Sequence, residues 1–479
     1  MRDMNEPTAQ NPATTPRDQS IERASSPFAF SSEQVTDHLD TRARYLEARG
    51  KADKSMFVRS SIDLRHGVEL ERSCPFQSVI AGMIDAPTIQ RLRWIGQLSA
   101  AWMVYPDAVH SRLTHVLGSA NLTAETLLHL HSRASANQKR ELEIWGPITV
   151  AFALCHDLGH AAPGSHLAQR VFFPNCPDSH EEVTHRIFRE DEGFRTWLDR
   201  VVGVGAAEKL DKVAEESSDV PRWTYQLVTG GGWNTDRGDW VPRDSHHCGV
   251  TYGFCEPKMI IRNLQITDKG ELVIGESGVS AIESFFQSRT HMYRDVYFHG
   301  TSRLGEKLPE LLVQRAREIN DHGQLKWADD DMRTVLTASD VRQLSLDTIY
   351  NMTEPWWSYH VQRWASEPDP ITSDLAQRIL LRHTIFKEWD LTPENAQLLR
   401  KMVETSDFDP RYYYVELAPM HIKVAKDLNS AMRVKRDNGE LVPLTAYSEV
   451  LAAVSELSSI RTPGLIGAPM EIWRGKSIN

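Results

Sequence analysis

The sequence predicts a mainly α-helical protein, with a helical core followed by an α+β lobe at its C-terminal end. Apolar residues recur every three to five positions from Met83 to Leu127, which is the spacing expected for one face of a helix. After about residue 330, helical segments alternate with strand-like runs and an Asp437-Asn438-Gly439 turn signal. The chain has 479 residues, of which 41% are hydrophobic, and is therefore long enough for a large core.

Three parts follow from this pattern. Residues 1–55 are rich in Pro, Ser, Thr, Asn, Gln and charge, so we expect a mobile polar leader there. Residues 56–330 are expected to form the core, and residues 331–479 the accessory lobe. Within the lobe we predict two helices, a strand and a hairpin, in this order: Ala338–Met352, Asp374–Glu388, Tyr412–Leu417 and a hairpin from Ile422 across Gly439.

The composition excludes some classes of protein. Mean hydropathy is −0.43, and apolar runs such as Ile148–Cys155 are far shorter than the roughly 20 residues that span a membrane. The five cysteines are scattered and form no CxxC pair, so we expect reduced thiols and a cytoplasmic location. The net charge of −11 argues against a non-specific nucleic-acid binder, although a local basic pocket can still hold phosphates.

Within the core, the pattern places three helical stretches in order. Apolar spacing predicts helix over Ile84–Leu98 and again over Leu113–Leu127. A buried helix is expected at Ile148–Leu158, where the apolar run ends at a glycine and a loop follows. This arrangement puts His156 and Asp157 at a helix end.

A further helix start is predicted at Ser179. Glu182 follows it three residues later, which is the spacing of a capping box, so His180 and Glu181 would lie in the first turn and face the preceding loop. The stretch Trp233–His247 is dense in Asp, Arg and His. Such density is unusual for an ordinary surface turn.

The paired His156 and Asp157 offer one imidazole and one carboxylate, a combination that suits Zn, Fe, Mn or Mg. Neighbouring helix residues point about 100° apart, so both can share one ion only near the helix end, with further ligands from elsewhere. His115 and Asp236 would complete a set of two histidines and two aspartates. In a chain with 19 histidines a single His-Asp pair is weak evidence, so the surrounding sequence decides its meaning.

Five blocks surround these residues and keep their order along the chain. They are IDAPTIQRLRWIGQL (84–98), YPDAVHSRLTHVLG (105–118), CHDLGH (155–160) with Ser165-His166, His180-Glu181, and DRGDWVPRDSHH (236–247). A run at 286–299 adds FQSR, Tyr293-Arg294, Tyr297 and His299. These blocks resemble the HD-domain deoxynucleoside triphosphate triphosphohydrolases, which implies an HD-domain helical core; the C-terminal lobe matches more loosely.

Residue by residue, the resemblance implies a divalent metal (Mn, Fe, Zn or Mg) and a reaction centre beside it. The metal ligands would be His115, His156, Asp157 and Asp236. The residues lining the reaction centre would be His160, His166, His180 and Glu181. In the family, activated water attacks the α-phosphorus and a histidine protonates the departing nucleoside oxygen, which releases tripolyphosphate. His166 stands at the position of that acid, and histidine suits the task because it titrates near neutral pH.

Substrate phosphates need positive charge. Arg112, Arg237 and Arg289 stand at positions that match phosphate contacts of the family, and each guanidinium can bind phosphate oxygens in pairs. Taken singly, each of these arginines could instead form a surface ion pair. The three together favour a triphosphate over a substrate with fewer phosphates.

The resemblance also implies a deoxyribose site. Gln97 and Asp244 match positions that bind the 3′-hydroxyl, and Tyr297 would pack under the sugar and exclude a 2′-hydroxyl. The remaining matched positions of the expected substrate site are Leu98, Trp240, Tyr293 and His299.

Three departures from the family pattern bear on catalysis and substrate preference. The loop from His156 to His166 is one residue longer than in the family. Trp240 stands where a tyrosine is usual, which removes a hydroxyl that could bind phosphate. Gln169 stands where an aspartate often accompanies the acid histidine.

A nucleotide activator site is a further expectation. Asp85, Gln90 and Arg93 match positions that read a guanine activator in the family. The alternative, that these side chains form pairs on a helix surface, has equal weight. The resemblance also implies a homo-oligomer.

The leading hypothesis is a dNTP triphosphohydrolase that lowers dNTP pools, as housekeeping or in defence against phage. An alternative within the hydrolases is an HD nucleotidase or phosphodiesterase that acts on another nucleotide. An alternative from another class is a nucleotide-sensing or single-stranded nucleic-acid-binding protein. The complete set of metal ligands and the acidity of the chain argue against this last reading.

Overall fold

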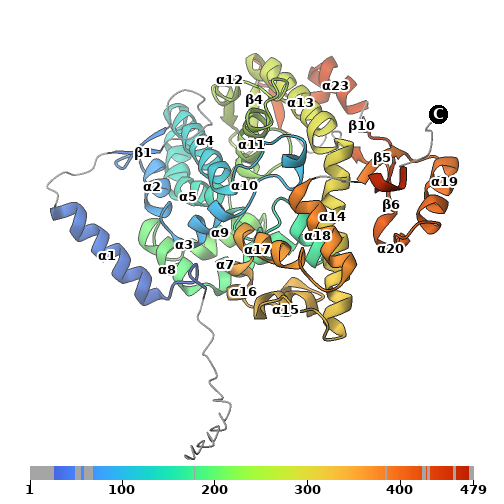
Figure 1. Cartoon of the computed structure of the whole chain (residues 1–479). Coiled ribbons are helices and arrows are strands. Elements are labelled where there is room, and N and C mark those ends of the chain that lie inside the picture. Colours follow the sequence, from blue (N-terminus) through green and yellow to red (C-terminus); the bar gives the residue numbers. More distant parts are fainter. Residues whose placement is uncertain are drawn as a thin grey trace, which may run out of the picture.

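The computed structural model describes residues 26–48, 55–58, 68–176, 179–382, 386–422, 428, 432–456 and 460–473. The described chain consists mainly of helices, and its short strands form four small sheets (Figure 1). The prediction of a mainly α fold with a small α+β part is confirmed.

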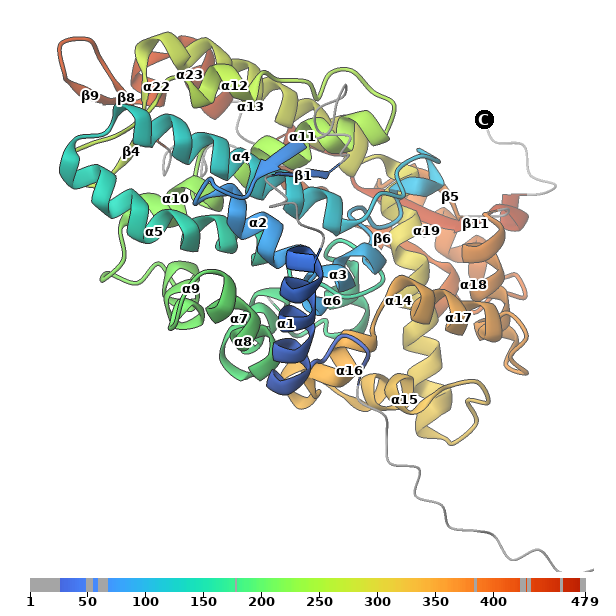
Figure 2. The same cartoon turned by 90° about the vertical axis from the view of Figure 1, so that its left-hand side faces the viewer.

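The core is built on two long helices that run side by side, α4 (Arg112–Arg133) and α5 (Ala136–Cys155) (Figure 2). Both helices are largely buried, α5 on all sides over Ile148–Cys155, and α11 (Thr235–His247) packs against α4. The elements that surround this pair are α2 (Gln77–Met83), α3 (Pro87–Arg91), η1 (Leu92–Trp94), η2 (Ala101–Met103), α6 (Leu167–Phe172), α7 (Ser179–Glu190), α8 (Glu192–Val201), α9 (Ala206–Ala214) and α10 (Arg222–Val228).

A second group of helices lies beside this core and leads into the C-terminal lobe. Its centre is α14 (Gly300–Asp321), which packs on α6, α15 and α18. The elements of the group are α12 (Pro257–Ile261), η3 (Glu276–Gly278), α13 (Val279–Met292), the π-helical turn η4 (Tyr293–Tyr297), α15 (Asp330–Thr337), η5 (Val341–Gln343), α16 (Leu346–Asn351), α17 (Glu354–Trp364) and α18 (Pro370–Leu381).

Two small sheets join distant parts of the sequence. In the four-stranded sheet the order is β3-β4-β8-β9, and β8 of the lobe pairs in parallel with β4 of the core. In the three-stranded sheet β11 lies between β5 and β6 and pairs antiparallel with both. The strands are β1 (Ser55–Val58), β2 (Val68–Glu71), β3 (Leu264–Ile266), β4 (Leu272–Gly275), β5 (Phe386–Asp390), β6 (Val415–Leu417), β7 (His421–Ile422), β8 (Arg433–Lys435), β9 (Leu441–Pro443), β10 (Ile460–Arg461) and β11 (Leu465–Pro469). The remaining elements are α19 (Pro393–Glu404), α20 (Pro410–Tyr413), α22 (Leu444–Tyr447), α23 (Glu449–Glu456) and η6 (Met470–Trp473).

The expected leader contains a helix that the sequence pattern did not predict. Residues 1–25 lie outside the described residues, but α1 (Ser32–Ala48) packs against α8. Val35 is fully buried, and the Thr196 hydroxyl donates to Ser32 Oγ at 2.8 Å. One buried apolar residue and a few polar contacts hold α1, which is why its apolar periodicity is weak.

Several predicted elements are shorter or broken. The apolar spacing over Ile84–Leu98 is not one helix, because Pro87 starts the new helix α3. The helix predicted over Ala338–Met352 is interrupted, since Asp340 and Ser345 cap separate short helices. Among the residues described near the end of α18, Arg382 adopts a left-handed conformation with φ 54°.

The helix predicted over Asp374–Glu388 is therefore wrong for its last part, where the chain forms β5. The strand predicted over Tyr412–Leu417 is limited to β6, because Tyr412 and Tyr413 end α20. The hairpin is confirmed as β8 and β9, with Gly439 at φ 87° in the turn. Residues 423–427 and 429–431, at the predicted start of the hairpin, lie outside the described residues.

Of the helices described, none is both long enough and apolar enough to cross a membrane.

Candidate active site

A cavity of about 980 Å³ lies where α4, α11, α13, α14 and the loop after α5 meet, with β6 of the lobe at its edge. All of the residues that the sequence assigned to metal, catalysis and substrate line this cavity, except His299. The lining residues from that set are Gln97, Leu98, Arg112, His115, His156, Asp157, His160, His166, His180, Glu181, Asp236, Arg237, Trp240, Asp244, Arg289, Tyr293 and Tyr297. His299 instead precedes α14 and lies edge-on to the ring of Tyr105, with 6.4 Å between ring centroids.

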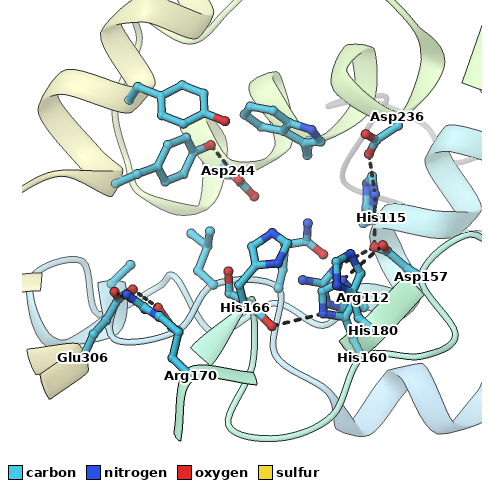
Figure 3. A pocket seen from close by; sticks show the side chains of 18 of the residues that line it. Arg112, His115, Asp157, His160, His166, Arg170, His180, Asp236, Asp244 and Glu306 are labelled. Atoms are coloured by element: carbon cyan, nitrogen blue, oxygen red, sulfur yellow. Dashed lines mark hydrogen bonds and ion pairs between the residues drawn. The ribbon is translucent and has the colours of Figure 1, made fainter. Parts of the chain in front are cut away.

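Four side chains from three segments converge at one end of the cavity (Figure 3). His115 Nε2 lies 3.1 Å from Asp236 Oδ1 and 3.6 Å from Asp157 Oδ2. His156 Nε2 lies 3.5 Å from the same Asp236 oxygen and 3.6 Å from Asp157 Oδ1. Ligand atoms around an ion bonded at about 2.1 Å are separated by roughly 3.0–3.5 Å. His115, His156 and Asp236 therefore have the spacing of a metal-ligand set, and Asp157 lies 3.6 Å from both imidazoles.

The chemistry of the donor atoms also fits a cation. His156 Nε2 is buried and has no hydrogen-bond partner, a costly arrangement for a polar atom that nothing binds. Two carboxylates accompany the two imidazoles, which suits Mn, Fe, Zn or Mg. A divalent ion would satisfy the buried nitrogen and both carboxylates together.

Hydrogen bonds on the outer side of each imidazole orient it toward the shared point. His156 Nδ1 lies 2.9 Å from the Ala153 carbonyl, to which it can donate, because α5 ends there and exposes that oxygen. His115 Nδ1 lies 2.8 Å from Asp239 Oδ2, and Arg243 holds the same carboxylate with two hydrogen bonds of 2.8 and 3.0 Å. These partners leave both Nε2 atoms available as ligands.

The electrostatics reflect the crowded charges. Burial alone would lower the pKa of His115, but its hydrogen bonds to Asp236 and Asp239 raise it to about 10. Burial would raise the pKa of Asp157, yet Arg112, His156 and His160 hold it well below its usual range. The carboxylates of this site therefore favour a positive charge between them, which either a metal ion or a proton on a histidine can supply.

Next to the metal ligands, three histidines form a cluster. The ring centroids are 5.3 Å apart for His160 and His166, 4.5 Å for His160 and His180, and 5.1 Å for His166 and His180. Burial and the neighbouring His166 lower the pKa of His180 to about 3. Desolvation in the cavity, with Arg112 adding to it, also lowers the pKa of His166. Of the three, His166 is the exposed one and faces the cavity.

The longer loop is anchored directly before His166. Ser165 N donates to the Gly96 carbonyl at 3.2 Å, and a side chain at Gly164 would meet that oxygen at 2.4 Å, so the close approach requires glycine. Glu354 accepts the Gly96 N–H at 3.2 Å from the other side. The loop is thus held to the segment that carries Gln97.

Backbone pairing also sets Gln97 beside the start of α4. Gln97 N donates to the His110 carbonyl and Arg112 N to the Ile95 carbonyl, both at 2.9 Å. The Arg112 side chain turns inward and donates to Asp157. The same two backbone hydrogen bonds therefore fix Gln97, a predicted sugar contact, and Arg112, a predicted phosphate contact.

The other two predicted phosphate-binding arginines lie on two different helices, α11 and α13. Arg237 donates to the carbonyls of Gly230 at 3.3 Å and Gly232 at 2.9 Å, which fixes its base near the glycine-rich turn before α11. Arg289 is buried on α13, with its guanidinium 5.3 Å from the ring centre of Tyr293. Both side chains line the cavity.

An aromatic wall and a buried carboxylate form the next part of the cavity. Asp244 is held by His110 at 2.9 Å and by the Tyr297 hydroxyl, which donates at 2.7 Å. The rings of Trp240, Tyr293 and Tyr297 contact one another, with centroids 5.2–6.1 Å apart. The π-helical turn η4 brings Tyr293 and Tyr297 to this wall.

The far end of the cavity contains charged residues that the sequence did not single out. Arg170 donates to Glu306, which also accepts from the Ser99 hydroxyl, and Arg170 Nε lies 3.9 Å from Glu310. Lys307 pairs with Glu310. Arg170 lies one turn after His166, a spacing that could have suggested it. The two glutamates on α14 belong to no motif.

The three predicted activator residues lie outside the lining of the cavity. Asp85 forms an ion pair of 2.7 Å with Arg42 of α1. Gln90 donates to the Ile84 carbonyl at 2.6 Å and accepts from Arg93 at 2.9 Å. All three therefore make contacts within the chain.

Comparison with known proteins finds similarities in sequence. The model of the "HD associated region" matches residues 257–354. The uncharacterized protein YwfO of Bacillus subtilis is 29% identical over 79% of this chain and 86% of its own length. The deoxynucleoside triphosphate triphosphohydrolases SAMHD1 of Bos taurus and Homo sapiens are each 25% identical over 55% of this chain. The match spans only 49% and 45% of those two relatives.

Solved structures share the fold. A phosphohydrolase of Bacteroides thetaiotaomicron matches with a TM-score of 0.73 and 22% identity, over 87% of this chain and 100% of that chain. A hypothetical protein of Aquifex aeolicus matches with a TM-score of 0.63 and 22% identity, over 87% and 98%. The chain therefore has the fold of these structures, and the comparisons together support an HD-domain family that resembles the deoxynucleoside triphosphate triphosphohydrolases.

Proposed function

We propose that this chain hydrolyses deoxynucleoside triphosphates to a deoxynucleoside and tripolyphosphate. The observation that carries the proposal is that one cavity is lined by the expected metal ligands, a histidine cluster, three arginines and an aromatic wall. His115, His156, Asp157 and Asp236 would hold the ion. A divalent ion bound there supplies Lewis-acid polarisation of phosphate oxygens and activation of water.

His166 is proposed as the general acid that protonates the departing 5′-oxygen of the nucleoside. It is the exposed member of the histidine cluster and has a ring nitrogen close to those of His160 and His180. A negatively charged substrate beside it favours the imidazolium form, which offsets the lowering of its pKa by desolvation. His160, His180 and Glu181 would surround the reacting phosphate.

The arginines would neutralise the phosphate chain, and the aromatic wall would hold the sugar. Arg112, Arg237 and Arg289 present planar guanidinium groups that suit phosphate oxygens. Asp244 would accept the 3′-hydroxyl. Tyr297, fixed by its hydrogen bond to Asp244, would leave no room for a 2′-hydroxyl.

The consequence in the cell would be lower dNTP pools, as housekeeping or in defence against phage. We also infer a homo-oligomer and a nucleotide activator from the relationship to the vertebrate enzymes.

Product analysis tests the proposal. Purified protein is incubated with each dNTP and NTP in Mn, Mg, Co or Zn, and the products are separated by ion exchange. We expect deoxynucleoside and intact tripolyphosphate from dNTPs, and no product from the His156→Ala, Asp157→Ala double variant. Phosphate or pyrophosphate as the first product would contradict attack at the α-phosphorus. Hydrolysis of nucleoside monophosphates or cyclic nucleotides instead would favour the nucleotidase or phosphodiesterase.

A further inference from the structure

Ser99, Arg170 and Glu306 form a polar group at the end of the cavity away from the metal ligands. Figure 3 shows Arg170 and Glu306 on one side of His166, and Asp157 with His115 and Asp236 on the other. One Glu306 oxygen accepts the Ser99 hydroxyl and the other accepts the Arg170 guanidinium. Arg170 and Glu306 are 49% and 24% exposed, so both can contact a ligand in the cavity.

The proposed role of His166 would direct the base of the substrate toward this group. His166 would protonate the nucleoside oxygen, so the nucleoside must lie on the side of His166 that faces away from the metal ligands. Arg170 lies one helical turn after His166, on the helix α6 that begins there. His166, the proposed proton donor to the leaving group, therefore stands at the N-cap of the short helix that carries Arg170, at the polar end of the cavity.

Two segments lead from the proposed sugar contacts to the same end. Ser99 follows the proposed 3′-hydroxyl contact Gln97 by two residues, with Leu98 between them. On the other side Phe298 directly follows Tyr297, and α14 then carries Glu306. Leu98 and Phe298 both line the cavity and offer apolar surfaces for the faces of a base, whose edge would then meet the polar group.

The donors and acceptors of the group match one base best. A carboxylate has two oxygens that accept two parallel N–H groups, and Arg170 adds a donor beside them. The Watson–Crick edge of guanine presents two adjacent donors, N1–H and N2–H, and then the acceptor O6. Adenine, cytosine and thymine each present a ring acceptor or only one donor there, which would face a carboxylate oxygen unpaired.

We propose that Glu306, held by Ser99 and flanked by Arg170, is a specificity-determining residue that reads the N1–H and N2–H edge of guanine. The chain then prefers dGTP among the dNTPs. This inference rests on the proposed dNTP hydrolysis and adds the base to it. Bidentate contacts of this kind discriminate between bases by about 1–3 kcal/mol, so we expect a preference on the order of 10-fold in kcat/KM.

The test compares kcat/KM for dGTP, dITP, dATP, dCTP and dTTP, with tripolyphosphate identified as the product. dITP differs from dGTP only in the 2-amino group. We expect dGTP to exceed dATP by on the order of 10-fold, with dITP in between. Equal values for all the dNTPs would overturn the inference and leave the proposed function standing. Absence of tripolyphosphate from every dNTP would overturn both.

A pair of matched variants locates the preference. Glu306→Gln keeps the size of the side chain but replaces one acceptor with a donor, so the dGTP to dATP ratio should fall toward one. Glu310→Gln changes the glutamate one turn later on α14, and this variant should keep the ratio. A merely structural role of Glu306 would lower all kcat/KM values together, and an unchanged ratio in Glu306→Gln would contradict the proposal.

Discussion

At the scale of single residues, the candidate metal site depends on atoms that do not touch the ion. Asp239 is fully buried, lies 2.8 Å from His115 and is held by Arg243. His156 relies instead on the Ala153 carbonyl at the end of α5. One ligand is thus oriented by a side chain and the other by the backbone, and only the first can be altered by substitution.

We therefore expect Asp239→Ala to weaken metal binding by about 10- to 100-fold, because His115 loses the partner that fixes its ring. Asp239→Asn retains an acceptor and should lose less. The measurement is chelator competition with Mn²⁺ on protein that circular dichroism shows to be folded. Glu143→Ala removes an exposed histidine–carboxylate pair, with His131 at 3.1 Å, and serves as the control. Equal affinity in Asp239→Ala and the wild type would contradict the expected role.

If the proposed function holds, selectivity for the deoxy sugar would depend on one residue, Tyr297. Removing the ring in Tyr297→Ala opens space beneath the sugar, so the ratio of kcat/KM for NTP over dNTP should rise, on the order of 10-fold. Tyr297→Phe keeps the ring but loses the hydrogen bond to Asp244. That variant should lower turnover of dNTPs while it keeps selectivity. A ratio that stays constant in both variants would show that another group excludes the 2′-hydroxyl.

At the scale of elements, one buried arginine joins α3 to the loop that follows α5. Arg91 is 1% exposed and donates to the carbonyls of Leu158 and His160 in the loop and of Ile349 and Tyr350 in α16. Burial lowers the pKa of Arg91 to about 10, which leaves the guanidinium charged at neutral pH. The loop, α3 and α16 are therefore joined at a single side chain.

Arg91→Met should lower the free energy of unfolding by about 3 kcal/mol or more, because four buried carbonyls lose their donor. Chemical denaturation followed by tryptophan fluorescence measures the loss. The matched control is Arg93→Met, two residues later, where the side chain is exposed and pairs only with Gln90; it should change stability by less than about 0.5 kcal/mol. Similar losses in both variants would show that the buried contacts add little.

The pH dependence of stability has a contribution from the start of α17. Burial raises the pKa of Glu354 above its ordinary value, although the Gly96 and Gly164 N–H groups oppose the effect. The folded state then binds this proton more tightly than the unfolded state, so the contribution is present at low pH. It is lost as the pH rises from the ordinary pKa of a glutamate through the raised one.

Glu354→Gln removes that titration and should gain stability relative to the wild type as the pH rises. Melting temperatures of both proteins between pH 4 and pH 8 measure the difference. Glu394→Gln, at an exposed position in the first turn of α19, should show no such trend. A difference between wild type and Glu354→Gln that is constant over this range would contradict the expected titration.

The elements differ in how far the sequence could predict them. α4 follows from apolar spacing, and the C-terminal half of α5 follows from a continuous apolar run, whose residues Ile148–Cys155 are all buried. The break at Arg382 and the caps at Asp340 and Ser345 divide segments whose spacing alone looks helical. Their positions depend on tertiary packing, which a local pattern does not contain.

At the scale of the whole molecule, the site gathers residues from Gln97 to Met420. The residues of the metal-ligand cluster could be named from the sequence because they stand in blocks whose order matches the resembled family. The distances between their ligand atoms become known only from the folded structure. Glu306 could not be predicted, because it meets Arg170 only when α6 and α14 pack together. His299 stands in a matched block, yet local geometry turns it toward Tyr105 and away from the cavity lining.

Metal binding should stabilise the whole chain, because only the folded state brings the four ligands together. A free Mn²⁺ concentration of 100 times Kd stabilises by about 2.7 kcal/mol, so differential scanning fluorimetry should show a higher Tm with Mn²⁺ than with EDTA. His156→Ala should lose this shift. His185→Ala, in a separate cluster with Asp211 and Glu215, should retain it. A shift that persists in His156→Ala would place the ion elsewhere.

Arg303 of α14 donates to the carbonyls of Ala418, at 2.7 Å, and Pro463, at 3.0 Å, and Ala418 also lines the cavity. The lobe is therefore one wall of the reaction chamber. A protein engineered to end before β5 would expose the chamber to bulk water on that side. A chimera that took this wall from a relative would change the shape of the cavity and keep the metal ligands, which lie in the core. Substitutions in the lobe could therefore change which substrates fit and leave the metal ligands unchanged.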